Sequence, residues 1–301
     1  MELPSSARRE TGSQSQRRYE LTGLAMVATA AILWGLLGPV ARVALREGVE
    51  PLELGFWRAA LAGLLCVVLA IMRRAPRVRG RDIAVLVGFG VVCVAIFYSA
   101  YFFAVELAGA ALAAILLYTA PAWVAIGSYL WLGELLTRRA LLAVAMTVTG
   151  IAFVALDSGT VEGINIGGII WGLVAGITYA LYYLIGRRYF AIYGTLNVLA
   201  YALPVGALAL LPMVNFTTKS GSAWAAILFI AVIPTFLAYL IYGAGLVRVS
   251  ATRAATTAAI EPLVAAIVAF ALWGERFGSG GYLGSGLVLV GVFLAAARPR
   301  S

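Results

Sequence analysis

The sequence predicts an all-α polytopic membrane protein of ten transmembrane helices, arranged as two inverted five-helix repeats. Three observations support this fold class: an apolar composition, ten long apolar runs, and an internal repeat at an offset of 141 residues. Hydrophobic residues make up 63% of the 301 residues and charged residues 12%, against roughly 25% charged residues in soluble domains. A soluble chain of this length would lack the charge to cover its surface.

Each apolar run is long enough to cross a bilayer, because about 20 helical residues span the hydrocarbon core. In chain order the runs cover residues 21–45, 53–72, 83–105, 110–132, 140–157, 166–188, 196–214, 223–246, 250–273 and 281–297. The runs are continuous rather than alternating, which excludes a membrane β-barrel. The connections between them are short, so we expect no soluble domain.

The segments outside the runs are polar and basic. We expect residues 1–20 to be a disordered cytoplasmic tail, with no apolar segment of the kind a signal peptide needs. Residues 298–301 form a second short cytoplasmic tail. With both termini in the cytoplasm, 17 Lys and Arg residues lie on the cytoplasmic side and 4 on the external side. This skew follows the positive-inside rule and explains the net charge of +9 without nucleic-acid binding.

The repeat is clearest between Ala110–Glu134 and Ala251–Glu275, which align without a gap and are identical at 8 of 25 positions. The same register pairs Tyr98 with Tyr239, Tyr101 with Tyr242, Pro121 with Pro262, Gly133 with Gly274, Glu134 with Glu275 and Gly150 with Gly291. Each copy holds five runs, and an odd number forces the second copy to cross in the opposite sense. The predicted units are therefore residues 21–157 and 158–297, with inverted topology.

Prolines and glycines interrupt the runs at particular places. Pro39, Pro121 and Pro262 lie inside spans, and each leaves the carbonyl four residues earlier without its helical partner. In a membrane such a carbonyl must face protein or a water-filled cavity, so we expect bends at a central cavity. Glycines end the fourth and ninth spans, and we expect the acids that follow, Glu134 and Glu275, to open the next helices as ordinary caps.

Aromatic side chains gather in the third, fourth, sixth and eighth spans. Tyr98 and Tyr101 lie three residues apart, on one face of a helix, and Tyr179 and Tyr182 repeat that spacing. A buried tyrosine hydroxyl needs a hydrogen-bond partner, so these faces are expected to point away from lipid. Two interpretations stay open: a cavity that holds an amphipathic guest, and ordinary packing between helices.

Two ionisable side chains lie within the spans. Glu261 is about eleven residues from either end of the ninth run, and Ala120 stands at its repeat position. It either pairs with an arginine or a free carbonyl, or it binds a substrate ammonium or couples protons. Arg58 lies nearer the external end of its span. It is an interfacial anchor, a partner for Glu53, or a clamp for a carboxylate.

The sequence lacks several features that common catalytic sites require. The chain has no histidine, which excludes histidine metal sites and Ser-His-Asp hydrolysis, and it has no Walker-type motif for ATP hydrolysis. An enzyme acting on lipids would need paired acids, whereas Asp82, Asp157 and Glu162 are isolated. We therefore expect no enzyme, no catalytic residue, no cofactor and no metal.

Together, the ten spans and the Pro…Gly-Glu ending of each repeat resemble the EamA-type transporters of the drug/metabolite transporter superfamily, over residues 20–297. The matching residues are Pro121, Gly133, Glu134 and Gly150, then Pro262, Gly274, Glu275, Gly284 and Gly291, with Trp34-Gly35 and Trp171-Gly172 opening the halves. One departure is Ala143, which stands where the second repeat has Gly284. The aromatic content looks most like the YddG-type exporters of aromatic and hydrophobic amino acids.

The resemblance implies a secondary transporter of a bacterial inner membrane that exports amino acids, or similar small amphipathic metabolites, by alternating access. It also implies a central aromatic-lined cavity, to which we assign Trp34, Tyr98, Tyr101, Tyr118, Trp171, Tyr179, Tyr182, Tyr239, Tyr242 and Glu261. Efflux of aromatic cationic drugs, or of another metabolite class, is the alternative, and a lipid-modifying enzyme is less favoured. The expected partners are an amino acid and the lipid bilayer, not nucleic acid, and we expect a monomer.

Overall fold

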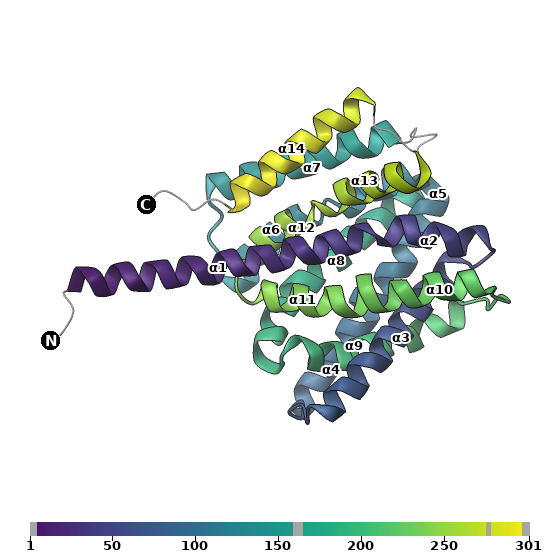
Figure 1. Cartoon of the computed structure of the whole chain (residues 1–301), viewed down its shortest axis with the longest axis horizontal. Coiled ribbons are helices and arrows are strands. Elements are labelled where there is room, and N and C mark those ends of the chain that lie inside the picture. Colours follow the sequence, from purple (N-terminus) through teal and green to yellow (C-terminus); the bar gives the residue numbers. More distant parts are fainter. Residues whose placement is uncertain (1–4, 159–164, 275–277, 297–301) are drawn as a thin grey trace.

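The computed structural model describes residues 5–158, 165–274 and 278–296, and every regular element in these ranges is a helix. Nine helical stretches of the described residues are long and apolar enough to cross a membrane, and the shorter apolar helix Ser279–Ala295 makes a tenth. They lie alongside one another in one bundle (Figure 1). The predicted all-α membrane fold is therefore confirmed.

Several spans are built from more than one helical segment. The first repeat contains α1 (Ser5–Gly35), α2 (Leu37–Arg46), α3 (Pro51–Met72), α4 (Gly80–Gly90), the π-helix η1 (Val91–Ile96), α5 (Phe97–Leu117), α6 (Ala120–Leu132) and α7 (Arg138–Ser158). The second contains α8 (Ile166–Tyr193), α9 (Thr195–Leu210), the short 3-10 helix η2 (Leu211–Met213), α10 (Gly221–Ile230), the π-helix η3 (Ala231–Leu237), α11 (Ala238–Leu246), α12 (Ala251–Ala258), α13 (Glu261–Trp273) and α14 (Ser279–Ala296). Within α5, Gly109 has φ 78° and ψ 159°, and this non-helical residue separates the third span from the fourth.

The N-terminal segment differs from its prediction. Residues 5–20 form the first part of α1, whereas the sequence predicts disorder up to residue 20. This polar segment has no proline, and adding residues to a nucleated apolar helix costs less than starting a new one. The Gln16 side chain donates to Glu20 one turn later, at 3.1 Å. In Figure 1 this part of α1 runs out beyond the other helices. The predicted tail at 298–301 lies outside the described residues.

Contacts between helix ends define two ends of the bundle. At one end, Arg253 of α12 forms an ion pair with Glu20 of α1 at 3.1 Å and donates to the carbonyl of Ala295 in α14 at 2.8 Å. At the other end, Asn215 donates to Glu50, the residue before α3, at 3.4 Å. We call these the terminal end and the far end.

The two repeats pack as an inverted pair. The second span α3 packs against the seventh, α9, and the fifth span α7 packs against the tenth, α14, so that each meets its own equivalent. The contact between α1 and α11 is matched by the contact between α8 and α5. Between α3 and α9, a Cβ added to Gly63 would lie 2.9 Å from Cδ of Pro204, its repeat equivalent. Equivalent residues in contact mark a pseudo-two-fold axis.

Glycines let α7 and α14 approach closely, and the two helices lie next to each other in Figure 1. A Cβ added to Gly150 would lie 2.6 Å from the Gly284 carbonyl oxygen. A Cβ added to Gly291 would lie 2.8 Å from the Ala143 carbonyl oxygen. These are reciprocal contacts of equivalent positions, in which small residues allow backbone to meet backbone.

Helix interruptions occur at equivalent places in the two repeats. The fourth span breaks at residues 118–119 and the ninth at residues 259–260. Pro121 and Pro262 are the second residues of the helices that follow, where a missing N–H costs nothing. The π-helices η1 and η3 likewise occupy matching places in the third and eighth spans. The chain therefore repeats its irregular segments as well as its helices.

The first span also breaks near its proline. Between α1 and α2 only Leu36 lies outside the helices, and the buried Pro39 is the third residue of α2. Pro39 has no N–H to donate to the Gly35 carbonyl four residues earlier. The break follows from that lost hydrogen bond.

Candidate functional site

The break in the ninth span places a carboxylate in the middle of the bundle. Glu261 is the first residue of α13, halfway along the membrane-spanning stretch Ala251–Leu272. The Ile260 carbonyl before it accepts two backbone N–H groups of the next turn, at 3.1 and 3.2 Å, so the half-helix begins here. Tyr118, at the equivalent break, and Tyr179 in α8 lie close enough to the carboxylate to interact with it. The two breaks thus meet at one acidic group.

Arg58 of α3 turns into the bundle and not out to the interface. Its Nε donates to Thr235 Oγ1 in η3 at 3.2 Å, and its guanidinium carbon lies 4.7 Å from the centroid of the Tyr98 ring. The Thr235 hydroxyl donates to the Ile230 carbonyl at 2.8 Å, which Pro234, four residues later, cannot reach with an N–H. The π-helical segment of the eighth span therefore holds the arginine in place.

The two central charges have opposite sign but do not touch. Arg58 and Glu261 act on each other electrostatically, yet within the described residues no ion pair at 4.0 Å or less joins them. Each side chain keeps part of its surface exposed. Tyr98, Tyr179 and Tyr239 lie close enough to Arg58 to interact with its charge. A ring of tyrosines therefore surrounds two separated charges.

Equivalent tyrosines of the two repeats meet beside these charges. The hydroxyl oxygens of Tyr98 and Tyr239, 141 residues apart, lie 3.5 Å from each other. The Tyr239 ring packs against Trp34 and Tyr182, with 5.5 Å between centroids in both cases. Trp34 packs in turn on Tyr242 at 5.0 Å. We call these five residues the central aromatic cluster.

Three polar atoms of the central aromatic cluster have no hydrogen-bond partner within the described structure. They are Nε1 of Trp34 and the hydroxyls of Tyr182 and Tyr242, whose side chains are 4%, 4% and 0% exposed. Leaving a buried polar group unpaired costs roughly 1–3 kcal/mol, and buried Tyr and Trp normally find a partner. The Tyr183 hydroxyl lies near that of Tyr242 without a hydrogen bond of 3.5 Å or less, and the cluster thus offers one N–H and two hydroxyls to the polar group of a bound molecule.

The structure brings nine of the ten predicted site residues together. Tyr101 lies near Glu261 and the other tyrosines are placed as described above. Trp171 is the exception, because it packs against Phe103 at 5.3 Å with 37% of its surface exposed. Its offset from Trp34 is 137 residues and not 141. The two tryptophans therefore lie about one helical turn apart in the repeat, and Trp171 does not reach the cluster.

Two residues of the site are not among those that the sequence predicts. The Tyr183 ring lies 5.1 Å from Tyr179 and 5.5 Å from Tyr242, and so connects the two groups of tyrosines. Its spacing of four residues from Tyr179 puts both on one helical face, a signal that marks it. The second is Thr235, the partner of Arg58, whose only signal is the proline directly before it.

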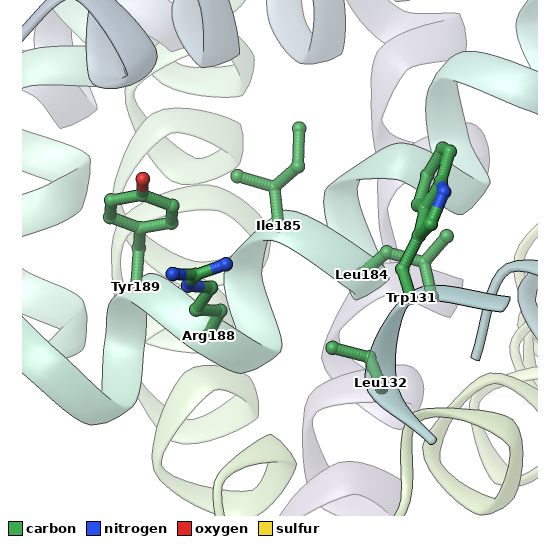
Figure 2. Close-up of a pocket in the computed structure, with 6 residues that line it drawn as sticks. All are labelled: Trp131, Leu132, Leu184, Ile185, Arg188 and Tyr189. Atoms are coloured by element: carbon green, nitrogen blue, oxygen red, sulfur yellow. The ribbon is translucent and has the colours of Figure 1, made fainter. Parts of the chain in front are cut away.

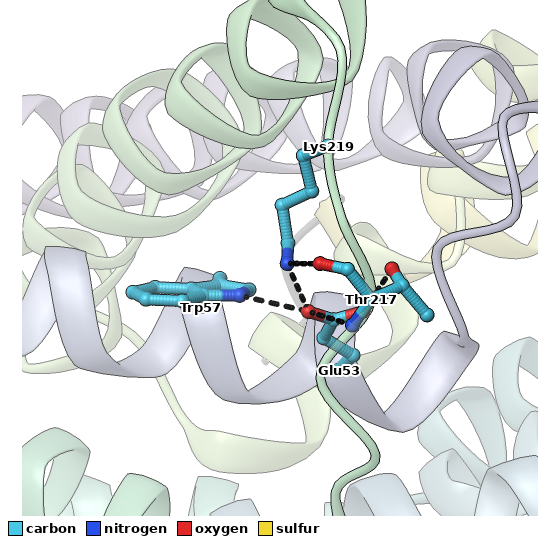
Figure 3. A network of polar contacts seen from close by, with 4 residues as sticks. All are labelled: Glu53, Trp57, Thr217 and Lys219. Atoms are coloured by element: carbon cyan, nitrogen blue, oxygen red, sulfur yellow. Dashed lines mark hydrogen bonds and ion pairs between the residues drawn. The ribbon is translucent and has the colours of Figure 1, made fainter.

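A polar network joins α3 to the loop 214–220 at the far end (Figure 3). Lys219 forms an ion pair with Glu53, whose side chain is fully buried. The Glu53 carboxylate also accepts from the N–H and hydroxyl of Thr217, at 3.3 and 2.8 Å, and from Nε1 of Trp57 at 3.3 Å. One sequence alternative paired Glu53 with Arg58. The structure corrects it, because Lys219 takes that place.

Glu134 caps a helix of the other repeat. Its carboxylate accepts from the backbone N–H of Ala251, the first residue of α12, at 2.9 Å and from the Thr252 hydroxyl at 3.5 Å. The sequence predicts instead a cap on the following helix, α7. The left-handed turn at Gly133, with φ 66°, ends α6 as predicted, and Glu134 then reaches across to α12, whose N-terminus favours a negative charge. Its counterpart Glu275 lies outside the described residues.

A cavity of about 200 Å³ lies between α6 and α8 near the terminal end (Figure 2). Its lining consists of Trp131, Leu132, Leu184, Ile185, Arg188 and Tyr189. Most of this lining is apolar, with a guanidinium and a phenol at one side (Figure 2).

For metal binding, no three His, Cys, Asp or Glu side chains in the described part of the chain lie close enough together.

Comparison with known proteins gives consistent matches along the chain. The model of the EamA-like transporter family matches residues 21–156 and 166–297. An uncharacterized transporter of Archaeoglobus fulgidus is 29% identical, covering 91% of this chain and 96% of its own length. A probable terminal-alkyne amino-acid exporter of Streptantibioticus cattleyicolor is 24% identical, with coverages of 91% and 93%. One crystal structure superposes with a TM-score of 0.78 at 19% identity, covering 91% and 96%, and so shares the fold.

Proposed function

Because the chain belongs to the EamA-like transporter family, we propose that it is a secondary exporter of aromatic and other hydrophobic amino acids. In this proposal the terminal end faces the cytoplasm of a bacterial cell, as the skew of 17 to 4 basic residues favours. The amino acid enters from that side and binds at the central aromatic cluster. It leaves on the other side when the inverted repeats exchange their shapes.

The observation that carries the proposal is the set of unpaired polar atoms inside the aromatic cluster. Trp34, Tyr182 and Tyr242 combine large ring surfaces with buried polar atoms that have no partner in the described structure. Rings alone would suit a purely apolar guest, and paired hydroxyls would suit a packed core. An amphipathic guest with an apolar side chain and a polar end matches both features. The name of the Streptantibioticus relative supports amino acids as that guest.

The test is flux through the purified chain in liposomes. Liposomes loaded with labelled phenylalanine should release it only when the protein is present, and unlabelled tryptophan or leucine inside should slow the release. The measurement is made with and without a pH gradient, so that proton coupling appears as a difference between the two conditions. If no amino acid moves in either condition, the proposal is wrong.

Efflux of aromatic cations is the second candidate, because Glu261 is a central carboxylate surrounded by tyrosines. Aromatic faces and a carboxylate together bind cations well. Arg58 opposes this reading, since it places a positive charge in the same region. The test measures uptake of a dye cation and amino-acid flux in the Glu261→Gln variant. If the variant loses dye uptake and keeps amino-acid flux, the second candidate is favoured.

A further inference from the structure

We propose that Arg58 and Glu261 together bind the two charged ends of a zwitterionic amino acid. The guanidinium of Arg58 holds the substrate carboxylate, and the carboxylate of Glu261 holds the substrate ammonium. This inference rests on the proposed function and adds to it the charge class and the orientation of the substrate.

Each of the two charged residues has an uncharged, apolar residue at the equivalent position of the other repeat. The repeat position of Arg58 is Leu199 and that of Glu261 is Ala120, and each of these counterparts is only 1% exposed. The scaffold therefore accommodates an apolar residue at either place. Ionisable side chains at this depth are costly and face a cavity or a partner. The repeat symmetry of the fold therefore does not require a charge at either position.

The contacts of Arg58 leave most of its donors unused. Its one hydrogen bond runs from Nε to Thr235, and in the described residues neither Nη1 nor Nη2 has a partner. A guanidinium carries five donors in a planar fork that matches a carboxylate. By contrast, the structural carboxylate Glu53 is paired directly with Lys219 and fully buried. Thr235 therefore holds the guanidinium at Nε, and the two terminal nitrogens can donate to a substrate carboxylate.

Glu261 interacts with the opposite charge of Arg58 without a direct ion pair. The side chains that interact with it, Tyr118 and Tyr179, carry neutral hydroxyls. No cationic group of the described residues lies within ion-pair distance of it. Hydroxyls donate to a carboxylate but do not neutralise it. A substrate ammonium would do so, with the nearby Tyr118 and Tyr101 rings adding cation–π attraction.

The charged pair is continuous with the central aromatic cluster. The Tyr98 ring lies against Arg58 at 4.7 Å, and its hydroxyl lies 3.5 Å from that of Tyr239. The Tyr239 ring packs on Trp34 and Tyr182. An amino acid held at the charges can therefore place its side chain among the rings. A zwitterion adds no net charge to the low-dielectric centre, and each of its ends meets an opposite charge.

The test compares phenylalanine with two molecules that each lack one charge, phenethylamine and 3-phenylpropionate. Binding to the purified full-length chain is measured by isothermal titration calorimetry. The wild-type chain should bind phenylalanine about 10- to 100-fold more tightly than either analogue, as expected for one charge-assisted hydrogen-bonded contact. Arg58→Gln should weaken phenylalanine by a similar factor and leave phenethylamine unchanged. Glu261→Gln should weaken phenylalanine and leave 3-phenylpropionate unchanged.

Matched controls come from charged residues at the terminal end. Arg248 contacts Sδ of Met26 at 3.1 Å and Glu134 caps α12, both in structural roles. Arg248→Gln and Glu134→Gln should leave the ratio between phenylalanine and the two analogues as it is in the wild-type chain. Unchanged binding of phenethylamine also shows that the Arg58→Gln chain is folded.

The outcomes separate this inference from the proposed function. If Arg58→Gln and the charge-keeping Arg58→Lys both weaken all three compounds equally, the clamp is wrong, while amino-acid export stands. The same holds if neither central variant changes the preference for the zwitterion. If the wild-type chain neither binds nor moves any amino acid, the proposed function is wrong and the clamp falls with it.

Discussion

At the scale of single residues, buried polar groups are hydrogen-bonded at the far end of the bundle and partly unpaired in its centre. At the far end, Glu53 receives donors from Lys219, Thr217 and Trp57. In the centre, the hydroxyls of Tyr182 and Tyr242 are buried without any partner in the described structure. Complete pairing is what stability favours. Unpaired buried groups are tolerated where a ligand completes them, at a cost to the empty protein.

This contrast predicts opposite effects on stability and on transport when a central hydroxyl is removed. Tyr182→Phe and Tyr242→Phe should leave the free energy of unfolding unchanged or raise it by up to ~1 kcal/mol, because an unpaired group is lost. Each should weaken phenylalanine binding several-fold, because the substrate loses a hydrogen bond. Thermal unfolding in detergent and liposome flux measure the two effects. A variant that is less stable and transports normally would contradict the assignment.

Some contacts between single residues have no signal in the sequence. The repeat shows that Tyr98 and Tyr239 are equivalent. Whether they touch depends on the rotation of each helix about its own axis, which is set by side-chain packing between helices. The sequence does not determine the direction of the Arg58 side chain, since a long side chain can reach outward or inward. Its partner Thr235 lies 177 residues away in the chain. Such a pairing has no local signal.

At the scale of elements, the glycine contact between α7 and α14 makes a sharp prediction within one helix. A Cβ at Gly284 would lie 2.8 Å from the backbone nitrogen of Val154, whereas a Cβ at Gly286 meets nothing within 4 Å. Gly284→Ala should therefore destabilise the chain by about 1–3 kcal/mol through overpacking. Gly286→Ala should be neutral or slightly stabilising, because alanine favours helix. Unfolding of both variants in the same detergent gives the comparison, and equal effects would refute close packing here.

The loop 214–220 is tied to α3 by a buried ion pair, which predicts a strong dependence on both partners. Glu53→Gln or Lys219→Met alone leaves one buried charge unpaired and should cost about 3–5 kcal/mol of stability. The double variant should recover a large part of that loss, because neither charge remains. A double-mutant cycle on thermal unfolding measures the coupling energy. Additive losses would show that the two side chains do not act as a pair.

Elements were predicted well where apolar length decides and less well where local geometry decides. The ten runs lie on the helical stretches of the structure because a hydrophobic segment must match the bilayer. The helix at residues 5–20 was not expected, since its polar composition hides that it continues an apolar helix. The π-helices η1 and η3 carry no composition signal of their own. Pro234 marks one of them, but η1 has no proline.

At the scale of the whole molecule, the arginine skew predicts which end of the bundle lies inside the cell. Cys66 and Cys93 are free and buried, so replacing both with alanine gives a background for single cysteines. Asn215→Cys at the far end should react with a membrane-impermeant maleimide in intact cells. Arg138→Cys at the terminal end should react only after permeabilisation. The reverse pattern would invert the topology and the proposed direction of transport.

The whole fold was more predictable than the whole site. Ten spans, two copies and an odd number of crossings per copy determine an inverted pair, whereas the packing of α3 on α9 and of α7 on α14 is known from the structure. The site depends on which faces of the helices turn inward. Trp171 shows the limit: the sequence motif repeats, but a shift of four residues moves it out to the surface.

The contact between Tyr98 and Tyr239 joins equivalent positions of the two halves, and such a contact limits which residues a symmetric pair of halves can carry there. In a precursor made of two identical half-length chains, the residue at this position would meet its own copy across the two-fold axis. Tyrosine tolerates its own copy, because a hydroxyl both donates and accepts. A charged residue at this position would contact an identical charge and be repelled. In two identical chains, every substitution would also be present in both copies. Arg58 has Leu199 at its repeat position and Glu261 has Ala120; because both halves belong to one chain, one half carries a cation and the other an anion without either charge being duplicated.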